Sequence, residues 1–368
     1  MRSIIEDFKK GLTEKIGNKT IIEWSRYLSI KNSNSFSVDH PGLLFKLFSL
    51  YSYLLYPYLP IMRSWRSDKP EQSRLIYLDP FAGNGLNKIH HNDLKHFICG
   101  SSVLTLLTSQ KLTYIRKKDF SFDQMILIDK SKDKIMLLSD RLDILIKDLD
   151  LQDYVICHKL DLNSKIITIS QDVTRKSFVI DLVNHINNIW SQFPRINIMF
   201  FIDPDTPSSL TAFLLNNLLS FPGDVIMLLH SGIFAEMVNK KRYSENKLID
   251  MLGYDKHQVK DLYKKTNNPQ DLEKIYVDRY EQIIKNIEIK RITSGSNKRD
   301  IIKKVPIKTK SRNYILLYAT RKTGGRDYKT WQREFEKLAN DIGKLSDTGN
   351  LALNVLSGEQ QQISFFFR

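Results

Sequence analysis

The 368-residue sequence is poor in cysteine and has only two, Cys99 and Cys157. Two thiols cannot build the disulfide framework of a small secreted domain, so their scarcity fits a reducing compartment. The chain also lacks a run of about 18 or more uncharged apolar residues, which a transmembrane helix requires. Residues 1–7 carry charges too early for a signal peptide. We therefore expect a soluble, cytoplasmic protein that does not bind membranes.

Several catalytic signatures are missing as well. There is no Walker A loop and no G-x-S-x-G sequence, so nucleotide hydrolysis and α/β-hydrolase chemistry have no support. His90, His91, His96 and Cys99 lie close together, but their spacing fits no structural zinc pattern. We interpret this segment as a loop leading into a helix and expect no metal site.

Acidic residues are outnumbered, with 41 Asp and Glu against 56 Lys and Arg, which gives a net charge of +15. Such an excess favours a polyanionic partner, most simply DNA or RNA, although lysine-rich composition alone could also produce it. The excess is concentrated in residues 285–312, where ten basic residues face two acidic ones, Glu288 and Asp300. The candidate phosphate-binding residues are Lys290, Arg291, Lys298, Arg299, Lys303, Lys304, Lys308, Lys310 and Arg312.

The most informative segment is an apolar run, residues 75–78, that leads into an acidic residue and a turn with two glycines. Glycine lets the backbone approach a ligand and adopt torsions that other residues avoid. A pattern of this kind, D-x-F-A-G-x-G, is typical of the S-adenosylmethionine site of Rossmann-like methyltransferases. Its spacing differs from the dinucleotide pattern G-x-G-x-x-G, which makes a dinucleotide enzyme the less favoured reading. The candidate cofactor residues of this turn are Asp79, Phe81, Ala82, Gly83 and Gly85.

The rest of the chain predicts an α/β fold. We expect strands at 74–79, 124–129, 154–160, 196–203 and 224–229, separated by helices at 101–110, 135–149, 178–192 and 210–219. Strands that alternate with helices indicate βαβ units and a mostly parallel sheet, whose ligands bind at the carboxyl ends of the strands. Two further strands, 301–308 and 313–319, would form a closing antiparallel pair and complete a seven-stranded methyltransferase sheet.

Five regions follow from this reading. They are an N-terminal helical segment (1–70), a Rossmann-like core (71–232), a helical insertion (233–290), the closing strands with the basic segment (291–325), and a C-terminal helix and tail (326–368). Within the first region we expect a buried helix at 42–56 that breaks near Pro57 and Pro60. In the last we expect a helix at 328–343 and a packed apolar end.

Four predicted strands end at or just before an aspartate, which would bring Asp79, Asp129, Asp161 and Asp203 to one edge of the sheet. Asp129, with Lys130 beside it, suits a ribose diol, because one carboxylate can accept from both hydroxyls. Asp161 and Leu162 would meet the adenine amino group, and Asp79 the methionine amino end. The alternative for any one of them is a helix N-cap.

The segment Asp203-Pro204-Asp205-Thr206 occupies the place where amino-methyltransferases of nucleic acids carry a D/N-P-P-Y/F turn. That turn holds an exocyclic amine with an acidic or amide oxygen and a carbonyl, and stacks an aromatic ring on the base. Asp203 and Pro204 are therefore the candidate catalytic residues. Asp205 and Thr206 replace the second proline and the aromatic residue, so the stacking platform is missing.

Residues 41–230 resemble the three-Cys-motif partner proteins. The resemblance rests on the glycine turn, on Ile128-Asp129-Lys130, on Phe201-Ile202-Asp203-Pro204, and on Gly100-Ser101, where Ser102 replaces the proline of the family. The family's Phe-Gly after the last motif is replaced by Asp205-Thr206. The resemblance implies a methyltransferase-like Rossmann fold, S-adenosylmethionine as cofactor and a possible protein partner.

Two hypotheses follow. The leading one is an S-adenosylmethionine-dependent methyltransferase that acts on or with nucleic acid. The alternative is a catalytically altered methyltransferase scaffold that binds nucleic acid or a protein partner, for example in a defence or modification system.

Overall fold

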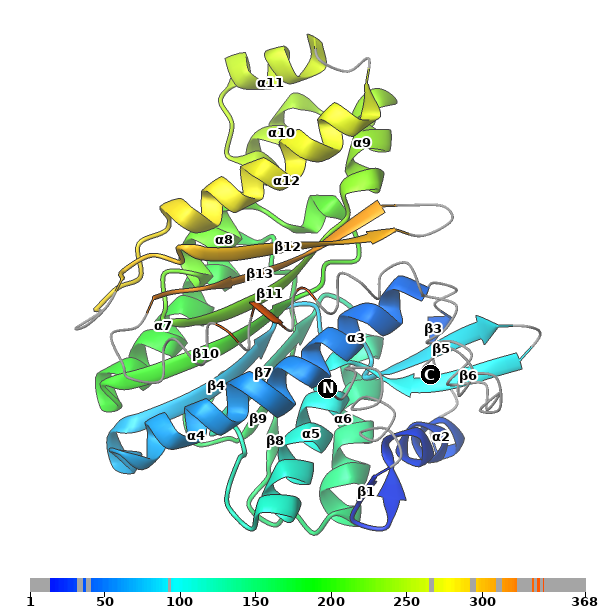
Figure 1. The fold of residues 1–368 in the computed structure, drawn as a ribbon, viewed down its shortest axis with the longest axis vertical. Helices are drawn as coiled ribbons and strands as arrows, with labels where there is room; N and C mark the ends of the chain where they lie inside the picture. Colours follow the sequence, from blue (N-terminus) through cyan, green and yellow to red (C-terminus); the bar gives the residue numbers. More distant parts are fainter. Residues whose placement is uncertain are drawn as a thin grey trace.

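The computed structural model describes residues 14–31, 36–37, 41–91, 94–264, 268–291, 296–308 and 313–322, with positions 333, 336, 337 and 340. Its centre is an eight-stranded sheet of order β12-β13-β11-β10-β4-β7-β9-β8 (Figure 1). The strands are β4 (Ser73–Asp79), β7 (Gln124–Asp129), β8 (Ile156–Cys157), β9 (Ile166–Ser170), β10 (Arg195–Ile202), β11 (Gly223–Leu229), β12 (Ile301–Lys308) and β13 (Asn313–Thr320). All pairings are parallel except those of β13, which runs antiparallel to β11 and β12. The predicted α/β, mostly parallel sheet with a closing antiparallel pair is confirmed.

Helices cover both faces of this sheet. α5 (Ser101–Arg116), α6 (Lys132–Asp148), α7 (Lys176–Gln192) and α8 (Ala212–Leu218) connect the parallel strands. Side chains alternate along β4, so that Leu75 and Tyr77 join the apolar core under α5 and α6, whereas Ile76 and Leu78 join the core under α7 and α8. Burial on both faces explains why the central strands are continuous apolar runs.

The third strand of the parallel order is where the prediction was wrong. Of the expected strand 154–160, only the two residues of β8 pair, at the edge of the sheet. The inner strand is β9, which was not predicted, although Ile166-Ile167-Thr168-Ile169 is a β-branched run of the kind that favours strands. The chain therefore leaves the carboxyl end of this strand at Ser170, followed by Gln171 and Asp172.

The N-terminal region is more regular than predicted. It contains β1 (Lys15–Ile16), β2 (Lys19–Thr20), α2 (Ile21–Lys31), β3 (Phe36–Ser37), α3 (Pro41–Tyr53), a π-helical stretch (Leu54–Tyr58) and α4 (Leu59–Ser67). The expected break near Pro57 and Pro60 does not occur. Pro57 lies in the π-helical stretch. Pro60 lies in the first turn of α4, a position that tolerates proline because it does not need a backbone N–H.

The segment that holds His90, His91 and His96 is also not the expected loop. It forms the hairpin β5 (Leu86–His91) and β6 (Leu94–Cys99), which pairs with β3 in a separate three-stranded sheet. Among the described residues no cluster of potential ligands could hold a metal ion.

The insertion is helical, as predicted, and comprises α9 (Ser231–Asn239), α10 (Glu245–Leu252), α11 (Lys256–Lys264) and α12 (Pro269–Asn286). Its buried residues, such as Phe234 and Tyr276, join the same core as α7 and α8, and Figure 1 shows the four helices gathered at one end of the molecule. The expected turn 309–312, most of the helix 328–343 and the apolar end lie outside the described residues. Within the described ranges no helix is long and apolar enough to cross a membrane.

Candidate functional site

The order of the strands locates the candidate site. From β4 the chain adds β7 and β9 on one side and then crosses to β10 on the other. In open α/β sheets such a reversal leaves a crevice at the carboxyl ends of the two central strands, and ligands bind there. The segments that follow β4, β7, β9, β10 and β11 meet at this edge, which we call the carboxyl rim.

The turn after β4 is held in a conformation that requires glycine. Gly83 has a φ of +63° and Gly85 a φ of +76°, values that side chains with a Cβ rarely adopt. A Cβ on Gly85 would lie 2.6 Å from Leu138 and 2.9 Å from Val103, so packing excludes a side chain there. A Cβ on Gly83 would meet no heavy atom within 4 Å. Gly83 is therefore glycine for its backbone torsion, and the space next to it is open to a ligand.

Asp79 stabilises this turn from its buried side. Its carboxylate is fully buried and accepts hydrogen bonds from the Phe81 N–H at 3.1 Å, the Ser101 hydroxyl at 2.5 Å and the Tyr77 hydroxyl at 3.3 Å. Burial raises the pKa of Asp79 to about 7, against the lowering effect of these hydrogen bonds. Asp79 therefore stabilises the turn in this structure, and its contact with a methionine amino group stays a prediction.

Asp129 is joined directly to the glycine turn. Its side chain is 5% exposed and accepts from the Gly83 N–H at 3.2 Å and the Ser131 N–H at 2.8 Å, with the Lys134 ammonium 3.8 Å away. Burial raises the pKa of Asp129, and the hydrogen bonds and Lys134 oppose the increase. The N-cap of α6 is Ser131, whose hydroxyl accepts from the Lys134 N–H. The simple N-cap alternative for Asp129 is therefore ruled out.

A small pocket with a cavity volume of about 20 Å³, partly open to solvent, lies beside Asp129 at the rim. Burial raises the pKa of Asp172 in this pocket, but hydrogen bonds from Thr174 and the charges of Lys130 and Arg175 outweigh it and leave the pKa below its ordinary value. The pocket is lined by Pro80, Phe81, Asp129, Lys130, Gln171, Asp172, Val173, Asp205 and Ser209.

Asp161 and Leu162 are not part of this rim. The Asp161 carbonyl accepts from the Gln124 side chain at 3.0 Å, and Gln124 begins β7, so Asp161 lies at the amino ends of the strands. Gln171 and Asp172 occupy the place expected for the pair. The β-branched run of β9 could have revealed them, because it marks where the third strand ends.

The candidate catalytic turn is held by two lysines that the sequence did not identify. Lys46 of α3 forms an ion pair with Asp203, and Lys134 of α6 pairs with Asp205 at 3.2 Å. Lys134 therefore lies between Asp205 and Asp129. Pro204 is buried between the two carboxylates. No local pattern links Lys46 to a turn 157 residues away.

The basic segment does not form one surface. Arg299 is fully buried and donates to the carbonyls of Gly223 at 3.0 Å, Leu219 at 2.6 Å and Phe221 at 2.8 Å. Its expected phosphate contact is therefore corrected, since this guanidinium stabilises the turn before β11.

The other basic residues of the segment are dispersed. Lys304 pairs with Asp278 and Glu281, and Lys303 with Glu336. Lys290 and Arg291 are exposed near the amino end of β11, over the rings of Phe221 and Trp190, and Lys298 is half-buried. The Lys308 side chain, Lys310 and Arg312 lie outside the described residues.

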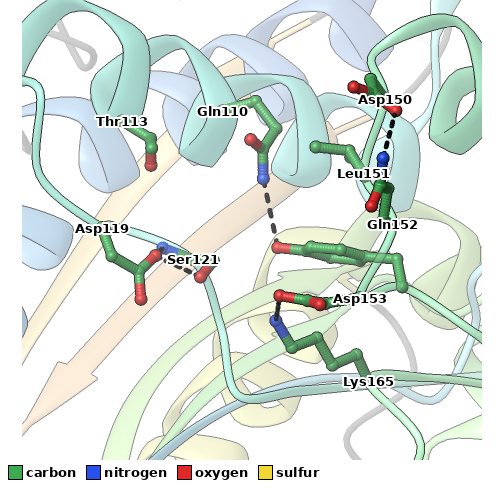
Figure 2. Close-up of a pocket in the computed structure, with 10 residues that line it drawn as sticks. Gln110, Thr113, Asp119, Ser121, Asp150, Leu151, Gln152, Asp153 and Lys165 are labelled. Atoms are coloured by element: carbon green, nitrogen blue, oxygen red, sulfur yellow. Dashed lines mark hydrogen bonds and ion pairs between the residues drawn. The ribbon is translucent and has the colours of Figure 1, made fainter.

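A second pocket of about 390 Å³ lies at the opposite, amino ends of the strands and contains none of the predicted site residues (Figure 2). Gln110 donates to the Tyr154 hydroxyl at 3.1 Å, and Lys165 lies 3.8 Å from Asp153. Asp150 accepts from Gln152, whereas Asp119 accepts from Ser121 and forms an ion pair with Arg66 of α4 at 3.0 Å. The carboxyl rim remains the stronger candidate although its pocket is much smaller, because that pocket adjoins Asp129 and the glycine turn.

Comparisons with known proteins assign no family. No protein-family model matches the chain, and no curated protein matches it. Among solved structures, a Legionella pneumophila protein described by the family model DUF519 is similar, with 11% identity, a TM-score of 0.37, and coverage of 83% of this chain and 94% of that chain. A likeness at this level is too weak to support a shared function.

Proposed function

We propose that the protein is an S-adenosylmethionine-dependent methyltransferase that acts on nucleic acid. The observation that carries the proposal is the hydrogen bond between the Gly83 N–H and Asp129, which joins the glycine turn to the acidic end of β7 beside an open pocket. Apart from the short edge strand β8, the sheet has seven strands with an antiparallel β13, as the resemblance to methyltransferases implies.

The pocket has the groups that a nucleoside needs. A carboxylate has about four acceptor positions, and two backbone N–H groups bond to Asp129, which leaves capacity for a ribose diol. Gln171 and Asp172 supply oxygens for the adenine amino group. The cavity volume of this pocket is only about 20 Å³, far below the range of about 300–1,000 Å³ for small-molecule sites. The proposal therefore requires that the rim segments move apart when a nucleoside binds, with the remainder of the cofactor along the open side of Gly83.

The charge around the pocket supports a polyanionic acceptor. Lys130 lines the pocket and is exposed, as are Lys132, Arg175 and Lys176 in the segments that follow β7 and β9. These residues surround the rim, unlike the basic residues near the amino end of β11. They are the better candidates for phosphate contacts, because an acceptor base at the rim would bring its backbone close to them.

One observation favours the alternative, a scaffold without methyl transfer. Both carboxylates of the Asp203-Pro204-Asp205 turn are paired with lysines, and no aromatic residue occupies the stacking position of that turn. A scaffold would keep the fold and its partner while losing the chemistry.

Calorimetric titration with S-adenosylmethionine and S-adenosylhomocysteine tests the proposal. We expect both to bind, and Asp129→Asn to weaken binding about 10- to 150-fold, the value of about 1.5–3 kcal/mol for hydrogen bonds to a charged group. Asp161→Asn is the matched control and should bind like the wild type, because Asp161 lies at the other end of the strands. Thermal unfolding of each variant controls for folding. A wild-type protein that binds neither compound would refute the proposal.

A further inference from the structure

His230, which follows β11 at the carboxyl rim, has no role in the site described so far. The residue is 8% exposed, and neither ring nitrogen makes a hydrogen bond of good geometry to a described residue. The ring contacts Tyr314 edge-on, with 5.1 Å between centroids. Buried polar atoms are nearly always hydrogen-bonded, and exceptions often mark functional groups.

The groups around His230 belong to the candidate catalytic turn. In the segment after β10, the charges of Asp203 and Asp205 and the Pro204 carbonyl favour the protonated imidazole. The charge of Lys46 in α3 opposes its protonation. On the other sides lie Tyr314 of β13 and the neighbouring Ser231, whose hydroxyl donates to Glu273 of α12. His230 is therefore a base near the Asp203–Lys46 pair: one ring N–H can interact with the Pro204 carbonyl, and the other ring nitrogen has no hydrogen-bond partner among the described residues.

We propose that His230 is a catalytic residue, the general base that accepts the proton lost by the methyl acceptor, and that this acceptor is a ring-conjugated amine of a nucleobase. The inference rests on the proposed function. The amine nitrogen forms a bond to the methyl carbon while the carbon–sulfur bond breaks and its electron pair returns to sulfur. The proton of the methylated nitrogen passes to a ring nitrogen of His230 and then to solvent. Asp203 orients the amine by accepting from its other N–H.

The environment of His230 explains the choice of acceptor. Burial lowers its pKa to about 4, and the opposing effect of Asp203 is partly offset by Lys46. At neutral pH the imidazole is therefore uncharged and can accept a proton, but it is a weak base. An aliphatic amine stays protonated after methylation, because so weak a base cannot remove its proton. A ring-conjugated amine becomes a strong acid on methylation, so a weak base is sufficient.

The first test uses S-adenosylmethionine with a tritiated methyl group and homopolymers as acceptor probes. We expect label in at least one of poly(A), poly(C) and poly(G) or their deoxy forms, whose bases carry exocyclic amines, and none in poly(U), whose base has no exocyclic amine. Equal label in poly(U) overturns the amine assignment. Binding of S-adenosylmethionine with no label in any polymer also overturns it, and leaves the cofactor pocket intact. Absence of binding refutes the proposed function itself.

The second test examines His230. We expect His230→Gln to slow single-turnover methyl transfer about 10²- to 10⁴-fold, the usual contribution of a general base, with unchanged affinity for S-adenosylmethionine. His185→Gln is the matched control, because His185 is also buried but bonds to Gln124 at the amino end of β7. Imidazole should partly restore the rate of His230→Ala.

The pH profile of the wild-type protein is independent of any variant's folding. We expect its rate to fall on the acid side as His230 becomes protonated, and His230→Gln to lose that limb. A wild-type rate without an acid limb, or a His230→Gln rate equal to that of His185→Gln, would overturn the role of His230.

Discussion

The buried carboxylate of Asp79 makes a prediction about stability that needs no knowledge of the substrate. Its pKa is raised from 3.8 to about 7, because burial beneath the glycine turn removes the charged form from water. A raised pKa in the folded state means that the folded protein binds the proton more tightly than the unfolded chain does. Stability from this group is complete below the unfolded pKa and is lost as the pH rises from about 4 to about 7.

The magnitude follows from the pKa difference. Each pKa unit corresponds to about 1.4 kcal/mol, so ionised Asp79 costs the folded state about 4 kcal/mol above pH 7. Asp79→Asn keeps the shape and an acceptor for the Phe81 N–H but does not titrate. We expect the free energy of unfolding of Asp79→Asn, minus that of the wild type, to increase by up to about 4 kcal/mol between pH 4 and pH 8. If the amide changes the free energy of unfolding by an amount that does not depend on pH, the whole curve shifts and its slope stays the same.

Urea unfolding at several pH values between 4 and 8 measures the curve. Tryptophan fluorescence and far-UV circular dichroism should report the same transition, which establishes the two-state behaviour that the free energy requires. Asp161→Asn is the control, since hydrogen bonding to Ser164 lowers the pKa of Asp161 and its stability contribution is lost only at acid pH. Parallel curves for Asp79→Asn and the wild type would refute the reasoning, because they would show that Asp79 ionises equally in the folded and unfolded states.

Three further predictions concern the glycine turn, the buried arginine and the rim. Gly83→Ala should destabilise the fold by about 1–2 kcal/mol through its positive φ alone. Gly85→Ala should destabilise it by more, because the added Cβ also meets Leu138 and Val103, and urea unfolding measures both variants. Arg299→Met should destabilise the fold by about 3 kcal/mol or more, because three carbonyls lose their donor, yet leave the nucleic-acid affinity of the folded protein unchanged; a loss of affinity without a loss of stability would contradict its structural role. Replacing Lys130 and Arg175 with Gln should reduce the steepness of log K against log salt by about 1.8 for duplex DNA or about 1.4 for single strands. Filter binding at several salt concentrations measures this slope, and an unchanged slope would show that neither residue contacts phosphate.

The sequence predicted those parts of the fold that depend on local pattern. β4, β7, β10 and β11 are apolar runs buried on both faces, and such runs stand out in any context. The sequence did not distinguish the inner strand β9 from the edge strand β8, because residues 154–160 and 166–170 both have strand character. Only pairing decides that β9 is the inner strand and β8 a two-residue edge.

The candidate site was predictable to a similar extent. Gly83, Gly85 and Asp129 are linked by a recognisable turn at a strand end, so the sequence alone placed them together. Lys46 reaches the rim from a helix 157 residues before Asp203, and nothing in its neighbours marks it. Lys134, five residues after Asp129, and His230, directly after the predicted strand 224–229, could have been found by examining the residues that follow each strand end. Arg299 shows the opposite failure. A basic residue in a basic segment predicts a surface, but the carbonyls at the end of α8 and in the turn before β11 draw this guanidinium into the interior.

The charges at the rim explain how a protein of net charge +15 can offer a site to a cation. Asp129, Asp203 and Asp205 lie close together, and two lysines, Lys46 and Lys134, are paired with them. These five groups carry one more negative than positive charge. The exposed basic residues Lys130, Lys132, Arg175 and Lys176 lie outside this set, in the segments that follow β7 and β9. In the proposed site, attraction to the buried Asp129 and the mostly buried Asp203 would favour a sulfonium, whereas the exposed Asp205 is screened by solvent and the positive periphery would attract a polyanion. A single sign of charge across the whole rim could not serve both ligands, and this separation is the feature that the cofactor and nucleic-acid proposals jointly require.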